Sequence, residues 1–192
     1  MQNQGFDRDS TRGFFENNLQ LIIRNWRLQG FQPAAEEVDY VVDKLTESCF
    51  SGCQGGDKEQ FWTARNGREL QQHLWDFLQG NISPVQSQRL GDQTLVFSGI
   101  VAIGFNRLLE ASSSAPLAEI GYFGKKNKVY DDRWYWQTGV KFYDRALRSG
   151  VLPPSQSRVI SRVAQNFMCW AAVISRIPEE EWLAKTFGLS RQ

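Results

Sequence analysis

The sequence predicts an all-α fold, a compact bundle of about six to eight helices that forms a single domain. Apolar residues recur every three or four positions over most of the chain, and residues that start and stop helices flank these stretches. No fixed-period repeat indicates a solenoid. A length of 192 residues with 41% hydrophobic content is enough for one sizeable core.

Two amphipathic segments open the chain. Ser10 is expected to cap a helix that runs to about Gln29, with Gly30 placed to end it. Pro33 suits the first turn of a second helix, which is expected to stop near Gly52. The residues expected to face the core are Phe15, Leu19, Ile22, Trp26, Val38, Val41, Val42, Leu45 and Cys49.

Two more helices are expected before the middle of the chain. The first covers about residues 57–78, with an interruption at Gly67, and ends at Gly80. The second is favoured over residues 83–109. Residues 94–105 also contain β-branched residues and glycine that would suit a short buried strand, so a strand there is the alternative.

The second half begins with the clearest internal linker. Residues 112–117 are rich in serine and include proline, so they could mark a subdomain boundary. Beyond them we expect a glycine and lysine loop at 121–127 and helices over 131–149 and 155–176. A short helix that Pro178 opens and Gly188 ends completes the chain.

Charge is divided unevenly between the two halves. Residues 1–110 carry 10 basic and 14 acidic side chains, whereas residues 111–192 carry 12 basic and 7 acidic ones. The possible boundary thus separates an acidic part, 1–111, from a basic part, 118–192. This asymmetry indicates an anionic partner for the basic part.

Each of the two long helices in the basic part has an apolar face and a separate basic row. Trp136, Val140, Tyr143 and Leu147 are expected inward in one helix, and Val159, Val163, Trp170 and Ile174 in the other. An i, i+4 step advances about 6 Å, comparable to the spacing of alternate phosphates along a strand. Guanidinium groups bind phosphate bidentately, and aromatic rings can stack on bases. The candidate nucleic-acid-binding residues are Lys125, Lys126, Lys128, Arg133, Trp134, Lys141, Arg145, Arg148, Arg158, Arg162 and Arg176.

The leading hypothesis assigns backbone binding to five of these cations: Lys141, Arg145, Arg148, Arg158 and Arg162. If about five phosphates are neutralised on a single strand, log affinity should fall against log salt with a slope near −3.5. An ordinary solvated helix face is the alternative explanation, and Asp131, Asp132 and Asp144 could pair with the arginines locally.

Residues for catalysis or metal binding are sparse. Cys49, Cys53, Cys169 and His73 have the composition of a Cys₃His zinc site, but their spacing argues against one. His73 is the single histidine, so the sequence holds no His-Glu-x-x-His pair, and residues 55–58 lack the spacing of a phosphate loop. We therefore predict a non-enzymatic protein with no cofactor and no bound metal.

The sequence also predicts a cytoplasmic protein without a membrane partner. The N-terminus lacks the cationic start and apolar stretch of a secretory signal, and the longest apolar run, residues 95–105, is too short to span a bilayer. Three cysteines at irregular spacing fit reduced thiols better than a disulfide framework.

In architecture, a small helical chain with the rows Lys141/Arg145/Arg148 and Arg158/Arg162 resembles the helical small subunits of CRISPR interference complexes. The likeness covers mainly residues 120–190. Such subunits lack catalytic residues, bind nucleic-acid backbone and pack against larger subunits. The resemblance implies a sequence-tolerant subunit for a single strand or hybrid duplex, with its acidic half facing protein neighbours. The alternative is a protein–protein adaptor whose basic face docks an acidic partner.

Overall fold

Seven α-helices make up the secondary structure of the computed structural model, which describes residues 7–26, 30–50, 67–111 and 132–177. These ranges contain no β-strand, so the all-α prediction is confirmed. The helices are α1 (Arg8–Trp26), α2 (Ala35–Phe50), α3 (Gly67–Leu78), α4 (Pro84–Ala111), α5 (Asp132–Arg148), α6 (Pro154–Gln165) and α7 (Phe167–Ile174). Within these ranges we find no helix with the length and hydrophobicity that a transmembrane span requires.

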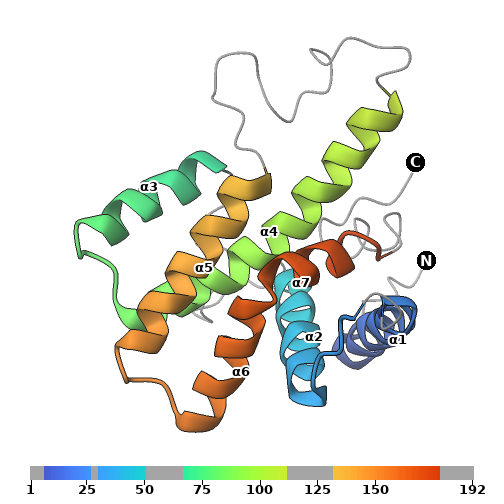
Figure 1. Cartoon of the computed structure of the whole chain (residues 1–192), viewed down its shortest axis with the longest axis horizontal. Coiled ribbons are helices and arrows are strands. Elements are labelled where there is room, and N and C mark those ends of the chain that lie inside the picture. The colour runs from blue at the N-terminus through green and yellow to red at the C-terminus, as the bar shows by residue number, and fades with distance from the viewer. Residues whose placement is uncertain (1–6, 27–29, 51–66, 112–131, 178–192) are drawn as a thin grey trace.

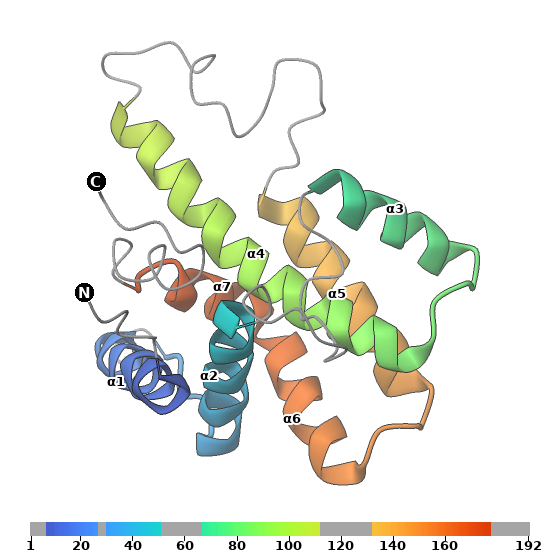
Figure 2. The ribbon, with the colours of Figure 1, turned by 180° about the vertical axis from the view of Figure 1, so that it is seen from behind.

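Helices α4 and α5 lie side by side at the centre and share the most extensive helix packing (Figure 1). Helix α3 lies on one side of this pair, and α6, α7, α2 and finally α1 lie on the other. The view from behind shows the same order, with α3 and α1 at opposite ends of the molecule (Figure 2). The possible boundary at 112–117 lies outside the described residues, but helices from both sides of it contribute to one core cluster.

The main core cluster confirms most of the expected inward residues. Phe15, Leu19, Leu45, Tyr143 and Trp170 are fully buried in it. Six other residues expected inward, all of them half-buried, pack against the same cluster: Ile22, Val38, Trp136, Val140, Leu147 and Val159. A second cluster joins α3 to α4 and α5. The α3 side of the molecule is therefore held by its own apolar contacts.

The helix starts differ from the expected positions by a few residues. Asp7, rather than Ser10, caps α1, because its carboxylate accepts hydrogen bonds from the backbone N–H and the hydroxyl of Ser10, at 3.3 and 3.2 Å. Helix α2 begins at Ala35, two residues after Pro33, and ends at Phe50. Glu37 reaches back to accept the Ala34 N–H at 3.1 Å, as in a capping box.

Helix α4 runs unbroken through the segment for which a strand was the alternative, so the strand interpretation is wrong. Ser83 and Gln86 cap its start reciprocally, at 3.2 and 3.1 Å. Within the helix, the hydroxyls of Thr94 and Ser98 donate to carbonyls one turn earlier, at 2.6 and 2.7 Å. These bonds satisfy polar groups that are fully buried, so the helix can carry them into the core.

The prediction of a single helix over residues 155–176 is wrong, because Asn166 interrupts the helix and separates α6 from α7. The Asn166 backbone has φ −102° and ψ 18°, outside the helical region. Its side-chain amide donates to Glu37 of α2 at 3.5 Å. The break turns α7, which is apolar nearly all round, into the core. The apolar spacing continues across Asn166, so the sequence pattern does not reveal the break.

Two glycines let the central helices approach closely. A Cβ on Gly91 of α4 would lie 2.6 Å from the ring of Tyr143. A Cβ on Gly139 of α5 would lie 2.3 Å from the ring of Phe167 and 3.2 Å from Thr94. Both rings are buried, so neither can move aside without disturbing the core. The positions of α4, α5 and α7 therefore require these two residues to lack a side chain.

A buried polar network ties α2 and α5 to α4. Asp92 of α4 is 3% exposed, and its Oδ1 accepts hydrogen bonds from the hydroxyls of Tyr40 and Tyr143, at 2.5 and 2.8 Å. The ammonium group of Lys44 lies 3.9 Å from Oδ2 of the same carboxylate. Lys44 also pairs with Glu47 at 2.9 Å. One carboxylate thus receives groups from two neighbouring helices.

Burial dominates the electrostatics of this network. It raises the pKa of Asp92 from 3.8 to about 6, although Lys44 and the two tyrosine hydroxyls favour the charged form and act in the opposite direction. Burial together with the Asp92 charge raises the pKa of Tyr40 and of Tyr143 well above 10.0. Both tyrosines therefore remain donors at neutral pH.

Gly139→Ala should destabilise the fold by about 1–3 kcal/mol, because the new methyl group overlaps the Phe167 ring. Gly13→Ala is the matched control, since a Cβ at this helical position meets nothing within 4 Å. It should stabilise by about 0.5–1 kcal/mol through helix propensity. Urea denaturation followed by circular dichroism measures both. An equal change in the free energy of unfolding for the two substitutions would contradict the close approach of Phe167 to Gly139.

Asp92→Asn should remove a component of the pH dependence of stability. Because the pKa of Asp92 is raised in the folded state, its stabilising contribution is complete below about pH 3.8 and is lost as the pH rises through about 6. Ionisation should lower the free energy of unfolding by roughly 3 kcal/mol at neutral pH. The asparagine oxygen can still accept both tyrosine hydroxyls.

Urea denaturation at a series of pH values tests this expectation. The difference in unfolding free energy between Asp92→Asn and the unsubstituted protein should change between about pH 4 and 7. Asp9→Asn, which removes an exposed carboxylate from α1, controls for the loss of one charge. Parallel curves for Asp92→Asn and the unsubstituted protein would show that Asp92 does not titrate in this range.

Candidate nucleic-acid interface

Helix α5 exposes a row of three cations on the face that it does not pack against α4. Phe142, Tyr143 and Ala146 of this helix are fully buried. Lys141, Arg145 and Arg148, at i, i+4 and i+7, are exposed. Packing on one side of the helix therefore fixes the direction of the basic row on the other.

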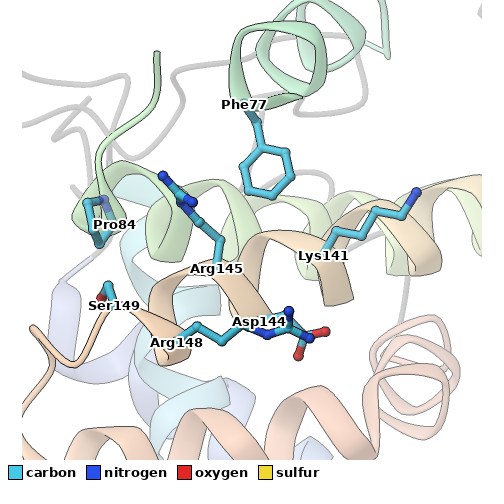
Figure 3. Close-up of a pocket in the computed structure, with 7 residues that line it drawn as sticks. All are labelled: Phe77, Pro84, Lys141, Asp144, Arg145, Arg148 and Ser149. Atoms are coloured by element: carbon cyan, nitrogen blue, oxygen red, sulfur yellow. The ribbon is translucent and has the colours of Figure 1, made fainter. Parts of the chain in front are cut away.

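These cations border an open hollow of about 500 Å³ between α5, the end of α3 and the start of α4 (Figure 3). The residues that line it are Phe77, Pro84, Lys141, Asp144, Arg145, Arg148 and Ser149. The three cations and one carboxylate leave two net positive charges around the hollow. We call this site the α5 hollow.

Within the described part of the chain, the three cations form no ion pair with a carboxylate, although Asp144 lies in the same lining. Other basic residues differ in this respect: Arg12 pairs with Asp43 at 3.1 Å and with Glu16 at 3.4 Å. The positive charge of the α5 hollow is thus available to an external anion. A concave surface with a net positive charge also concentrates its electrostatic field.

Phe77 gives the α5 hollow an apolar side. Its ring points from α3 toward α5 and lies between Arg145 and Lys141 (Figure 3). It packs edge-to-face on Phe142, with ring centroids 5.4 Å apart and an interplanar angle of 82°. Phe77 is half-buried, so part of the ring remains open to the hollow. Pro84 adds a second apolar surface beside Arg145.

The second predicted row, on α6, is placed differently. Arg162 lies 4.0 Å from Glu36 of α2, and neither Arg162 nor Arg158 lines the α5 hollow. The space between α6 and α2 is bordered instead by Glu36, Asp39 and Asp43. The structure therefore groups Lys141, Arg145 and Arg148, and it leaves the two α6 arginines, which are both exposed, outside that group.

The remaining candidate residues have mixed positions. Trp134, one of the predicted nucleic-acid-binding residues, is half-buried against the second core cluster and packs edge-to-face on Tyr135, with ring centroids 5.0 Å apart. It is thus packed on one side rather than freely presented. Arg176 is exposed beyond α7. The side chain of Arg133, and all of Lys125, Lys126 and Lys128, lie outside the described residues.

Sequence reasoning missed the contribution of α3. Phe77 looks like an ordinary core residue of an amphipathic helix, and Pro84 like an ordinary helix start. The packing of α3 on α5 brings Phe77 to the basic row, and the packing of α4 on α5 brings Pro84 there. No local pattern in the sequence carries that information.

The zinc candidates do not form a site in the described part of the chain. Cys49 is buried in α2, and Cys169 is half-buried on α7 against the same core cluster. Cys53 lies outside the described residues. Among those described, no group of three His, Cys, Asp or Glu residues could hold a metal ion.

Asp92 is the carboxylate with the most perturbed pKa in the described residues, a property that often marks catalytic groups. It is nevertheless buried between helices and borders neither the α5 hollow nor the space between α2 and α6. Its contacts are those of a residue that joins helices.

Comparisons with known proteins add no relative to this description. No protein-family model matches the chain, and neither a curated protein nor a solved structure matches it.

Proposed function

We propose that the chain is a non-enzymatic helical subunit that binds a nucleic-acid backbone through the α5 hollow. The observation that carries the proposal is the group of three exposed cations, Lys141, Arg145 and Arg148, with no carboxylate partner in the described part of the chain. Phosphates along a strand supply the matching charge at a similar repeat distance. Contacts of this kind are sequence-tolerant, because they do not read base edges.

The proposal places the protein in the cytoplasm, within a larger ribonucleoprotein such as a CRISPR interference complex. Three cations neutralise only about three phosphates, so they give a weak affinity on their own. A subunit with such a footprint fits a role in which other subunits hold the same strand. The α6 arginines are left out of the binding group, because neither lines the α5 hollow and Arg162 lies 4.0 Å from Glu36.

The salt dependence of binding tests the proposal. Three neutralised phosphates on a single strand should give a slope of log affinity against log salt near −2. The double substitution Arg145→Glu/Arg148→Glu should weaken binding about tenfold or more at low salt and bring the slope close to zero, because one cation and three carboxylates then line the hollow. Fluorescence anisotropy of a labelled oligonucleotide measures both quantities.

The matched control is Arg8→Glu/Arg24→Glu, which makes the same charge change on exposed residues of α1, at the opposite end of the molecule from α3. It should leave the slope unchanged. Both double variants should retain the thermal stability of the unsubstituted protein, because the substituted side chains are exposed. A salt slope near zero for the unsubstituted protein would exclude backbone binding at the α5 hollow. An equal loss of affinity in both double variants would exclude it as well.

A second candidate function, a protein–protein adaptor, is favoured by exposed apolar residues. Trp75 and Leu78, one turn apart on α3, are 59% and 62% exposed, and Val85 at the start of α4 is 53% exposed. Exposed tryptophans are typical anchors for a partner protein. An acidic partner could contact these residues and the basic row of α5 together.

The adaptor function makes a different prediction from nucleic-acid binding. An acidic protein should copurify with the chain after nuclease treatment, and Trp75→Ala should reduce its capture at least about tenfold with little change in stability. Copurification that disappears with nuclease would exclude the adaptor function and favour the nucleic-acid one.

A further inference from the structure

The α5 hollow has a feature that backbone binding does not require. A surface that only neutralises phosphates needs cations, whereas this hollow places a partly exposed phenyl ring between two of them. Pro84 extends the apolar surface beside Arg145. Cations around an apolar ring match a ligand that is charged at one end and flat and aromatic at the other.

Among polyanions, a nucleic acid with an unpaired base has both of these parts. The phosphates of its backbone meet guanidinium and ammonium groups, while the base has a π-face that stacks on an aromatic side chain. The volume of the hollow, about 500 Å³, lies within the usual range for small-ligand pockets. It therefore has room for one nucleotide unit in addition to backbone contacts at its rim.

We propose that the α5 hollow is selective for single-stranded nucleic acid, and that it holds one unpaired base against Phe77 while Lys141, Arg145 and Arg148 hold the flanking phosphates. This inference rests on the proposed function and adds the class of strand and the aromatic contact. In a duplex the bases are paired and stacked inside the helix, so a ring that lies between the cations reaches only the backbone.

The structure of α3 supports this role for Phe77. The Phe77 ring packs edge-to-face on the fully buried Phe142, and this contact restrains the ring before a ligand arrives. A rigid platform loses little conformational entropy on binding. The exposed Trp75 of the same helix lines neither described hollow, so the two aromatic residues can be tested separately.

Three ligands of equal length separate the base contribution from the charge contribution: an oligothymidylate, the same backbone without bases, and a duplex. Fluorescence anisotropy at moderate salt should show that the protein binds the oligothymidylate more tightly than the abasic strand, by roughly fivefold or more. It should also bind the oligothymidylate more tightly than the duplex.

Phe77→Leu should remove most of the preference for bases, lowering the affinity for the oligothymidylate far more than the affinity for the abasic strand, because leucine fills the space above Phe142 without offering a flat ring. Trp75→Leu is the matched control on the same helix, and it should keep the preference. Thermal denaturation of both variants checks the fold. Should Phe77→Leu fail to fold, the comparison of the three ligands on the unsubstituted protein still tests the inference.

The outcomes distinguish this inference from the proposed function. Equal affinity for the oligothymidylate, the abasic strand and the duplex, with the salt slope retained, would overturn the base contact while backbone binding stands. A preference for bases that survives Phe77→Leu would overturn the role of Phe77. No binding of any ligand at low salt would overturn both the inference and the proposed function.

Discussion

The close packing of α4 against α5 is the constraint on which the rest of the structure depends. It requires Gly91 to lie against the Tyr143 ring, and it requires Gly139 to leave space for Phe167 of α7. The same contact buries Asp92, whose carboxylate then needs the hydroxyls of Tyr40 and Tyr143. The close helix contacts at the two glycines and the hydrogen bonds of Asp92 thus belong to the same α4–α5 interface. A change in either the contacts or the hydrogen bonds would move three helices together.

This packing also determines what α5 offers to solvent. Because one face of the helix is held against α4, Lys141, Arg145 and Arg148 are directed away from the core. Helix α3 then closes one side of this basic row through the contact of Phe77 with Phe142. The α5 hollow is therefore a product of two interfaces, one that orients the charges and one that supplies the apolar side.

The acidic and basic halves of the sequence are only partly separate in the folded structure, because ion pairs connect them. Helix α2 carries Asp39 and Asp43, which face Arg12 of α1, and Glu36, which faces Arg162 of α6. These contacts use acidic groups of the first half to satisfy basic groups from both halves. The row on α5 forms no ion pair with a carboxylate in the described residues, although Asp144 lines the same hollow, so its positive charge is only partly offset.

The sequence by itself determined the helical class, most of the buried positions and the basic row on α5, because these depend on local propensity and on the 3.6-residue period of a helix. Tertiary structure decided the break at Asn166, where Glu37 of α2 accepts a hydrogen bond from the side chain, and the burial of Trp134 against the second core cluster. It also decided that Phe77 and Pro84 border the cations while the α6 arginines do not. These features depend on which helices meet and at what distance, and contacts between residues far apart in the chain leave no periodic signal in the sequence.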